Sequence, residues 1–161
     1  MFSLLRKNKS EKILKSVEEC LQQYGFEYKN PEDGFIILLV KPSSNVHRVL
    51  MIADEEERTL CVCVGGKEIP DNKRIICLEF IARVNHVNKM GCFDFDVDDG
   101  KLLYRHCIDL TGGQLTVEMV RQMLLYSVGI YDVHLNVLEN IIESDITALD
   151  AHKLIAPEYY R

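Results

Sequence analysis

The sequence predicts an α+β domain in which helices pack on one face of a five-stranded antiparallel sheet, in the order α-β-β-β-α-β-β-α. Three observations support this fold class: apolar stripes at helical spacing, short apolar runs typical of strands, and turns too short for parallel crossovers. The length of 161 residues fits one domain. We expect a flexible basic start over residues 1–9, a folded domain over 10–144, and a loosely structured tail over 145–161.

Three segments have the periodicity of helices. The first is expected over Ser10–Tyr24, where apolar residues recur every three or four positions, with Ser10 as N-cap and Gly25 as the terminating residue. The second begins near Asp71 and ends at Gly91. It is apolar on almost every side, so it should be buried or covered by a second subunit. The third runs from Val117 to about Ile142, after Thr116 as N-cap.

Five shorter runs read as strands. The first three are connected by short turns and therefore predict an antiparallel meander; they are Phe35–Lys41, Val46–Ala53 and Thr59–Val64. The first of them is apolar throughout, as in a central strand buried on both faces. The other two, Cys92–Val97 and Lys101–Ile108, form a predicted hairpin around an Asp-Gly turn.

The charge pattern argues against nucleic acid as a partner. The net charge is −6, and the first fifteen residues carry a net +4, which leaves −10 for the remaining chain. Affinity for nucleic acid depends on Lys and Arg neutralising phosphates, so an acidic body disfavours it. The basic start could touch an anionic surface, but a solvated, frayed terminus is the simpler interpretation.

The hydropathy pattern places the protein in the cytoplasm by default. No apolar segment at the start resembles a secretory signal, because only Phe2, Leu4 and Leu5 precede a run of lysines. The longest apolar run, Phe35–Val40, is far shorter than the roughly 20 residues of a membrane span.

Six cysteines occur in the chain, most of them within apolar segments: Cys20, Cys61, Cys63, Cys77, Cys92 and Cys107. Free cysteine behaves as a small and often buried hydrophobic residue, so we expect all six to be reduced thiols. Cys61 and Cys63 should share one face of a strand. Two thiolates alone make a poor zinc site, and no metal or cofactor is expected.

Part of the chain resembles a known family. The resemblance rests on Arg83–Lys89 (RVNHVNK), Phe93–Arg105 (FDFDVDDGKLLYR), and Gly112–Thr116 (GGQLT) before a long last helix. These segments are similar to those of the YbjN family, bacterial proteins described as sensory transduction regulators with a fold like that of type III secretion chaperones. The element order agrees over Ser10–Ile142. The resemblance implies a small chaperone- or adaptor-like protein that often self-associates, and it implies no catalytic residues.

The hairpin contains spaced aspartates that imitate a calcium-binding loop. Asp94, Asp96 and Asp98 occupy the first, third and fifth positions of such a loop. However, Asp99 stands where glycine is needed and Arg105 where a bidentate glutamate is needed. We therefore expect an exposed hairpin without a specific calcium site.

The sequence shows no evident pairing of a catalytic nucleophile with a general base. The five histidines lie in different predicted elements: His47, His86, His106, His134 and His152. Cys107 follows His106 directly, and neighbours on a strand face opposite sides. Cys77 and His86 are nine residues apart on one helix, about 13.5 Å of rise, so they cannot pair.

The second helix supplies the candidate partner surface. Asn85 and Asn88 lie one turn apart near its end, where they either tie down the following loop or recognise a partner. With Ile76, Phe80 and Val84 they form a candidate partner or dimer surface. A second candidate face consists of Ile75, Leu78 and Ala82. Alternatively, the third helix covers these residues and closes the core within one chain.

The function expected from these features is a non-enzymatic, protein-binding chaperone- or adaptor-like regulator, acting as a homodimer on another polypeptide. The alternative is a small ligand-binding regulator or minor enzyme with a pocket lined by cysteine and histidine. Polar groups converging around Cys61, Cys63 or His106 would favour the alternative.

Overall fold

The fold is described from a computed structural model of residues 2–32, 34–54 and 56–160. Side chains are described for all of these except residues 2–12, 31–32 and 159–160. The helices are α1 (Phe2–Gln23), α2 (Arg74–Val87), α3 (Val117–Glu143) and α4 (Ala148–Ile155), with short 3-10 helices at Asp71–Lys73 and Pro157–Tyr160. The strands are β1 (Tyr28–Glu32), β2 (Phe35–Val40), β3 (His47–Asp54), β4 (Thr59–Glu68), β5 (Cys92–Phe95) and β6 (Lys101–Asp109).

The strands form one antiparallel sheet in the order β1-β2-β3-β4-β6-β5. The predicted meander and hairpin are confirmed, but the sheet has six strands, so the prediction of five is wrong. The additional strand, β1, has little apolar pattern and contains Pro31. It lies at the edge and pairs only with β2, where a proline is tolerated because one side of the strand needs no partner.

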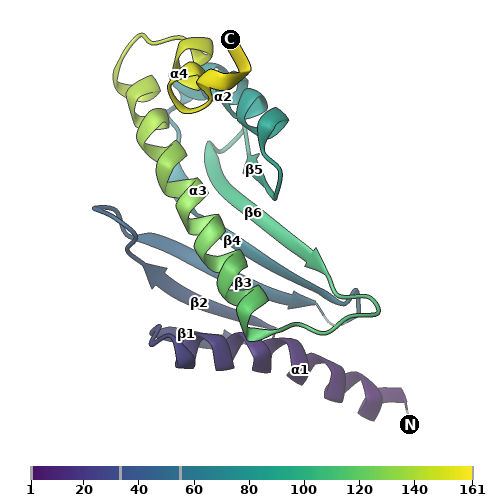
Figure 1. Ribbon diagram of the computed structural model, residues 1–161. Coiled ribbons are helices and arrows are strands. Elements are labelled where there is room, and N and C mark those ends of the chain that lie inside the picture. The colour runs from purple at the N-terminus through teal and green to yellow at the C-terminus, as the bar shows by residue number, and fades with distance from the viewer. Residues whose placement is uncertain (1, 33, 55, 161) are drawn as a thin grey trace.

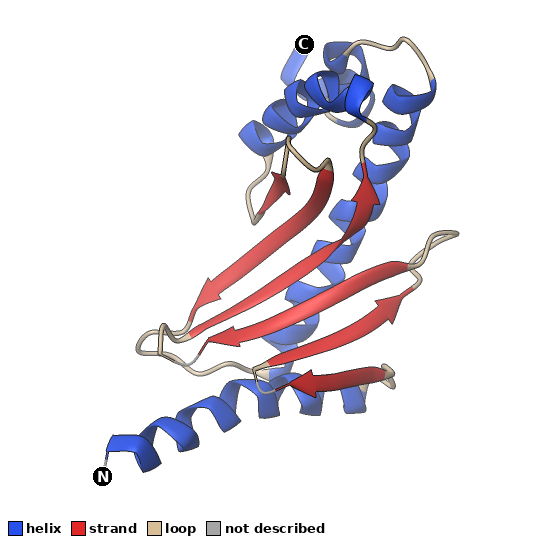
Figure 2. Ribbon diagram, turned by 180° about the vertical axis from the view of Figure 1, so that it is seen from behind, coloured by secondary structure: helices blue, strands red, loops and turns tan. Residues whose placement is uncertain are grey.

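Helices cover one face of the sheet and leave the other bare (Figures 1 and 2). In Figure 1, α3 crosses the sheet diagonally while α1 lies along the β1 side. The view from behind shows the strands in front of the helices, with no helix on the near side. The fold class therefore agrees with the prediction of helices on one face.

The core lies between α3, α1 and the covered face. Alternate residues of the central strands point into it, and Val49, Met51, Val62 and Val64 are completely buried. Tyr104 on β6 also lies in the core, and burial raises its pKa to about 12. Burying alternate residues of each strand under a helix is the usual arrangement for a half-covered antiparallel sheet.

The two ends of the chain are more helical than the sequence suggested. The backbone of α1 is helical from Phe2, whereas a flexible start was expected up to residue 9. The expected loose tail contains α4, which begins after Thr147, whose side chain accepts a hydrogen bond from the Asp150 amide. Ala148 and Ala151 are buried, so α4 packs as part of the domain.

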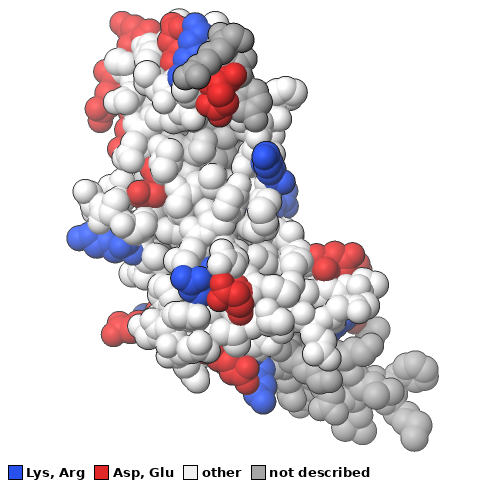
Figure 3. Space-filling view, viewed as in Figure 1, with Lys and Arg blue, Asp and Glu red and all other residues white. Residues whose placement is uncertain are grey.

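Within the described part of the chain, no helix combines the length and apolar character needed to cross a membrane. Figure 3 shows that acidic side chains gather over the end of the molecule formed by α3 and α4. Lysine and arginine side chains are scattered on the same view, which gives this face no continuous basic surface.

Candidate protein-docking surface

The bare side of the sheet, hereafter the outer face, carries rows of side chains set by the strand register. A polar row of Asp54, Thr59 and Asp109 lies at the β3–β4 turn, and three further rows follow it. The first of these three is Phe35, Ile52, Cys61 and Cys107. The middle row is Ile37, Leu50, Cys63, Arg105 and Cys92. The third row is Leu39, Arg48, Gly65, Leu103 and Asp94. Most of these side chains are apolar, although no helix covers them (Figure 2).

Several residues of the outer face are open to solvent. Leu39 is 67% exposed and Ile52 is 39% exposed. This corrects the prediction that the first apolar run is buried on both faces. Its alternate residues Ile36 and Leu38 enter the core, whereas Leu39 points outward. The signal that could have revealed an exposed apolar face was the lack of enough helices to cover both sides of the sheet.

A shallow groove of about 310 Å³ runs over the third row and is lined in part by Arg48, Leu50 and Cys63. Its floor depends on Gly65, because a Cβ at this position would lie 2.8 Å from Cβ of Leu103. The absence of a side chain on Gly65 thus lets β6 approach β4 closely and keeps the outer face flat at this point.

The charged side chains on the outer face are Arg48, Arg105 and Asp94 within the three rows, Asp54 and Asp109 beside the β3–β4 turn, and Glu68 with Lys101 at the opposite end of β4 and β6. Arg105 Nη2 lies 3.2 Å from Asp94 Oδ2, and both side chains are about half exposed. An exposed ion pair of this kind contributes at most about 1 kcal/mol to folding. Its position at the β5 edge gives the apolar rows a polar rim.

A second exposed apolar surface lies on α2. Ile75 is 74% exposed, and Leu78 and Ala82 are also exposed. Their spacing of three and four residues places them on one stripe of the helix. This α2 stripe is one of the two candidate faces from the sequence, and the structure leaves it uncovered by the described residues.

The other candidate face is occupied within the chain. Phe80 is 1% exposed and Val84 is 2% exposed, while Ile76 is partly buried against the core. The Phe80 ring lies 6.5 Å from the rings of both His134 and His152, on α3 and α4. Because α4 was not expected, the sequence could not indicate which side of α2 it would cover.

The two asparagines of α2 make internal hydrogen bonds. Asn85 donates to the carbonyl of Phe93 at 2.9 Å and accepts from its amide at 2.8 Å. Asn88 Nδ2 donates to the hydroxyl of Tyr104 at 3.1 Å, and its Oδ1 accepts from Tyr126 at 3.1 Å. These contacts support the first of the two interpretations, in which the asparagines tie down the neighbouring loop and strand.

The loop after α2 needs glycine at position 91. Gly91 has φ +73°, and a Cβ there would lie 2.5 Å from the carbonyl oxygen of Arg105. The hydroxyl of Tyr104 donates to the carbonyl of Met90 beside it. Asn88, Gly91 and Tyr104 therefore fix the connection from α2 to the sheet.

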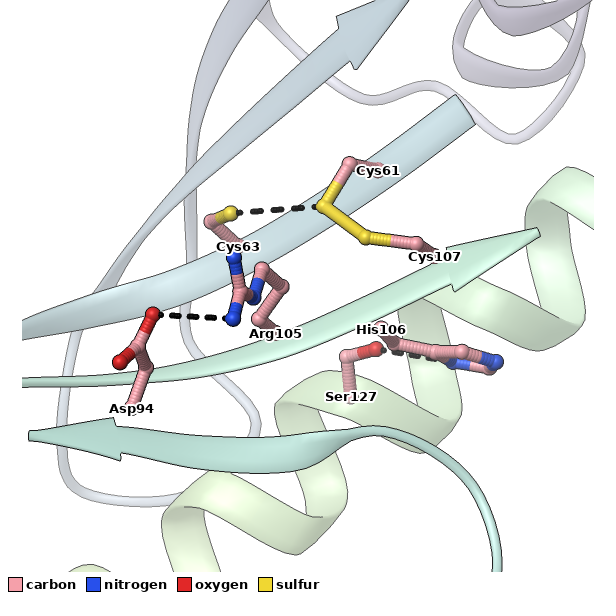
Figure 4. The surroundings of a disulfide bond; sticks show 7 residues. All are labelled: Cys61, Cys63, Asp94, Arg105, His106, Cys107 and Ser127. Carbon is pink, nitrogen blue, oxygen red and sulfur yellow. Dashed lines mark hydrogen bonds and ion pairs between the residues drawn. A yellow bond between two sulfur atoms is a disulfide. The ribbon is translucent and has the colours of Figure 1, made fainter. Parts of the chain in front are cut away.

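The cysteines differ from the prediction of six reduced thiols. Cys61 on β4 and Cys107 on β6 are directly opposite in register and form a disulfide. Cys63 lies next to them, with its Sγ 3.8 Å from that of Cys61 (Figure 4). Cys20 and Cys77 are buried free thiols, as expected. The prediction was wrong because Cys61 and Cys107 are far apart in the sequence, and only the pairing of β4 with β6 brings them together.

His47 and Ser43 both contact the carboxylate of Asp132 on α3. His47 Nε2 lies 2.6 Å from Oδ1 of the buried Asp132, and Ser43 Oγ donates to Oδ2 of the same carboxylate at 2.8 Å. The carboxylate therefore stands between hydroxyl and imidazole, so the imidazole does not activate the hydroxyl. These contacts join the β2–β3 loop to α3.

A cleft of about 520 Å³ lies beside the end of β6, where β5 no longer pairs with it. His106 and Cys107 contribute to its lining together with Tyr126 and three methionines: Met90, Met119 and Met123. Burial lowers the pKa of His106, whose Nδ1 lies 3.4 Å from Ser127 Oγ. The side chains of His106 and Cys107 point to opposite faces of β6, as predicted.

The hairpin aspartates serve the turn. Asp96 Oδ1 accepts hydrogen bonds from the amides of Asp98 and Asp99, and Asp99 accepts one from the amide of Lys101. Such bonds are typical of aspartate in tight turns. Within residues 2–32, 34–54 and 56–160, no group of three or more possible ligand side chains is placed to hold a metal ion.

Comparison with solved structures shows a shared fold at low identity. A chain of the HopA1–SchA chaperone–effector complex matches with a TM-score of 0.55 and 12% identity, over 84% of this chain and 96% of the other. A chain of the ExsC–ExsE complex matches with a TM-score of 0.56 and 17% identity, over 80% and 95%. YbjN from E. coli matches with a TM-score of 0.50 and 12% identity, over 90% and 93%.

No match was found among curated proteins. A family model does match, over residues 14–130, and its description is "Putative bacterial sensory transduction regulator". This range holds α2, the hairpin and the start of α3, which include the segments that resembled the family in the sequence. The match spans well over half of the chain, and the chain therefore belongs to the YbjN family.

Proposed function

We propose that this protein is a non-enzymatic, chaperone- or adaptor-like regulator that binds a segment of another polypeptide on the outer face. The observation that carries the proposal is the apolar composition of that face in the absence of any helix covering it. Soluble monomers rarely expose contiguous apolar area of this kind unless it binds something. We place the protein in the bacterial cytoplasm.

The shape of the surface suits an extended peptide or an amphipathic helix. Its apolar rows, including Ile37 and Leu50, lie next to Arg48 and the Arg105–Asp94 pair, which supply polar contacts at the rim. Apolar centres with polar rims are the usual composition of protein interfaces. Two solved complexes that contain a chain of the same fold also contain a partner protein, and one of them is a chaperone with its effector.

The proposal is tested with a charged variant of the outer face. Leu39→Lys combined with Ile52→Glu changes two exposed side chains and leaves the net charge unchanged. The matched control is Leu125→Lys with Val133→Glu, which alters two exposed apolar residues of α3. Partners are captured from native lysate, identified by mass spectrometry, and remeasured with purified components by calorimetry.

We expect the outer-face variant to bind the purified partner at least about tenfold more weakly than wild type, and the α3 control to bind normally. Both should retain wild-type circular dichroism. Equal binding by both variants and wild type would contradict the proposed surface.

We also propose a homodimer formed through the α2 stripe of Ile75, Leu78 and Ala82. A two-fold contact places the same stripe on both chains, so a single charge is introduced twice. Ile75→Glu with Leu78→Glu should convert a dimer into a monomer of 18.6 kDa in light scattering. A wild-type mass of 18.6 kDa at tens of micromolar would contradict the dimer.

A second candidate function is small-ligand binding in the cleft beside β6, and its volume and lining of His106, Cys107 and Tyr126 favour it. Methionine-rich linings adapt to varied apolar groups. Thermal-shift screening of wild type against Met119→Lys tests this function. Stabilisation by a compound in wild type alone would support it, and no stabilisation by any compound would count against it.

A further inference from the structure

We propose that the cysteine cluster on the outer face is a thiol–disulfide exchange site for small thiols, in which Cys107 is attacked and Cys61 leaves. The inference does not depend on the proposed protein-binding function. It rests on the positions, exposure and neighbours of Cys61, Cys63 and Cys107, which Figure 4 shows together.

The disulfide is accessible from solvent. Cys107 is exposed and Cys61 is half-buried, on a face that no helix covers. Structural disulfides persist because reductants cannot reach or displace their sulfurs, whereas exposed ones are the labile and regulatory ones. Cys20 and Cys77 are fully buried and remain thiols, so they provide an internal comparison within the same chain.

The edge of the sheet leaves space beside Cys107. The β5–β6 pairing ends at Cys92 and Arg105, so residues 106–109 of β6 have a strand neighbour only on the β4 side. The cleft of about 520 Å³ that Cys107 helps to line lies at this open end. An attacking sulfur must approach roughly along the S–S axis, and here the axis extends from Cys61 on β4 past Cys107 on β6 toward the open edge.

Cys63 can assist the leaving sulfur. Its Sγ lies 3.8 Å from Cys61 Sγ, and because the disulfide sulfur has no proton, the Cys63 thiol is the donor of this contact. Burial raises the pKa of Cys63, so the thiol keeps its proton at neutral pH and can donate it as a hydrogen bond. A donor to the departing Cys61 thiolate stabilises the product of the first step. Cys63 therefore acts directly on the reacting sulfur, as a catalytic hydrogen-bond donor.

The reaction has two balanced steps. A small thiolate attacks Cys107 Sγ, a new sulfur–sulfur bond forms, the Cys61–Cys107 bond breaks, and its electron pair leaves on Cys61, which then takes a proton from water. A second small thiolate attacks the sulfur of the attached small molecule and releases Cys107 as thiolate. Two small thiols are oxidised to their disulfide and the protein disulfide is reduced to two thiols. The small disulfide is the oxidant of the reverse reaction.

The test uses the folded full chain in buffers of reduced and oxidised glutathione at different ratios. Free thiols are trapped by rapid alkylation and assigned by peptide mass mapping. We expect Cys61 and Cys107 to change together and reversibly between disulfide and thiol, while Cys20 and Cys77 stay unlabelled until denaturant is added. Six thiols at every ratio would overturn the proposal. A disulfide that excess reduced glutathione opens only after unfolding would overturn it as well.

The role of Cys63 is tested by two substitutions of similar size. Cys63→Ser keeps a donor and should retain the wild-type rate of reduction by glutathione. Cys63→Ala removes the donor and should slow it by about tenfold, the usual effect of one hydrogen bond to a charged group. Cys77→Ser, in the buried core of the domain, is the control and should leave the rate unchanged. Equal rates for the Ser and Ala variants would overturn the assistance by Cys63.

Discussion

Replacing Asn85 with alanine tests whether this residue serves the fold or a partner. The side chain makes two hydrogen bonds with the backbone of Phe93 on β5, at 2.9 and 2.8 Å. Each is worth about 1 kcal/mol net, and leaving the Phe93 amide and carbonyl poorly paired adds to the loss. Alanine recovers about 0.5 kcal/mol through its higher helix propensity. The free energy of unfolding should therefore fall by about 2 kcal/mol.

The assay is equilibrium unfolding in urea, monitored by circular dichroism, with thermal unfolding as a second measurement. For a domain of this size the change corresponds to a melting temperature lower by about 4–8 °C. The matched control is Asn136→Ala on α3, whose side chain, among the described residues, donates to the carbonyl of Asp132 in its own helix. That variant should stay within about 0.5 kcal/mol of wild type. An Asn85→Ala protein as stable as the control would refute the structural role and return Asn85 to the candidate partner surface.

Four further changes have expected effects on stability. Gly91→Ala should lower the free energy of unfolding in urea by more than about 2 kcal/mol, because Gly91 has positive φ and a Cβ there would clash with β6. Gly129→Ala inside α3 should raise the free energy of unfolding by about 0.5–1 kcal/mol, because a Cβ there would meet no neighbouring atom within 4 Å. Burial raises the pKa of Tyr104 to about 12, whereas its value in the unfolded chain is about 10. The stability that the protonated Tyr104 contributes is therefore fully present below about pH 10 and is lost as the pH rises to about 12. Tyr104→Phe should reduce this loss of stability at alkaline pH, measured by thermal unfolding as a function of pH. The Cys61–Cys107 disulfide joins residues 46 apart in the chain, so breaking it should lower the free energy of unfolding by about 2–4 kcal/mol. Matched urea titrations with and without reductant measure this difference. Equal stability in the two titrations would contradict the expectation.

Hydrophobic periodicity and capping residues predicted those helices and strands whose apolar residues are the ones that pack into the core. Thr116 caps α3 by accepting from the Met119 amide, and the helix ends one residue after the expected Ile142. The short strand β1 and helix α4 were missed because their sequences are weakly patterned and their pairing partners lie elsewhere in the fold.

The candidate surface depended on tertiary contacts that periodicity cannot supply. Phe80 and Ile75 occupy the same apolar helix, and only the position of α4 decides that the first is buried and the second exposed. Likewise, Cys61 meets Cys107 because β4 pairs with β6 across the intervening α2 and β5. The exposed outer face follows from the same cause, since all the helices that contact the sheet core lie on the opposite side.

The placement of β4 beside β6 has a consequence for the order of folding. Strands β1 to β4 follow one another in both chain and sheet, so their pairing closes only short loops. Formation of the β4–β6 ladder instead requires closure of a long loop that contains α2 and β5. Loop closure of this length slows the formation of contacts, so we expect the meander to be structured early and the β6 side to join it in the rate-limiting step. In a φ-value study, core substitutions in β3 should then slow folding, while those in β5 should mainly accelerate unfolding.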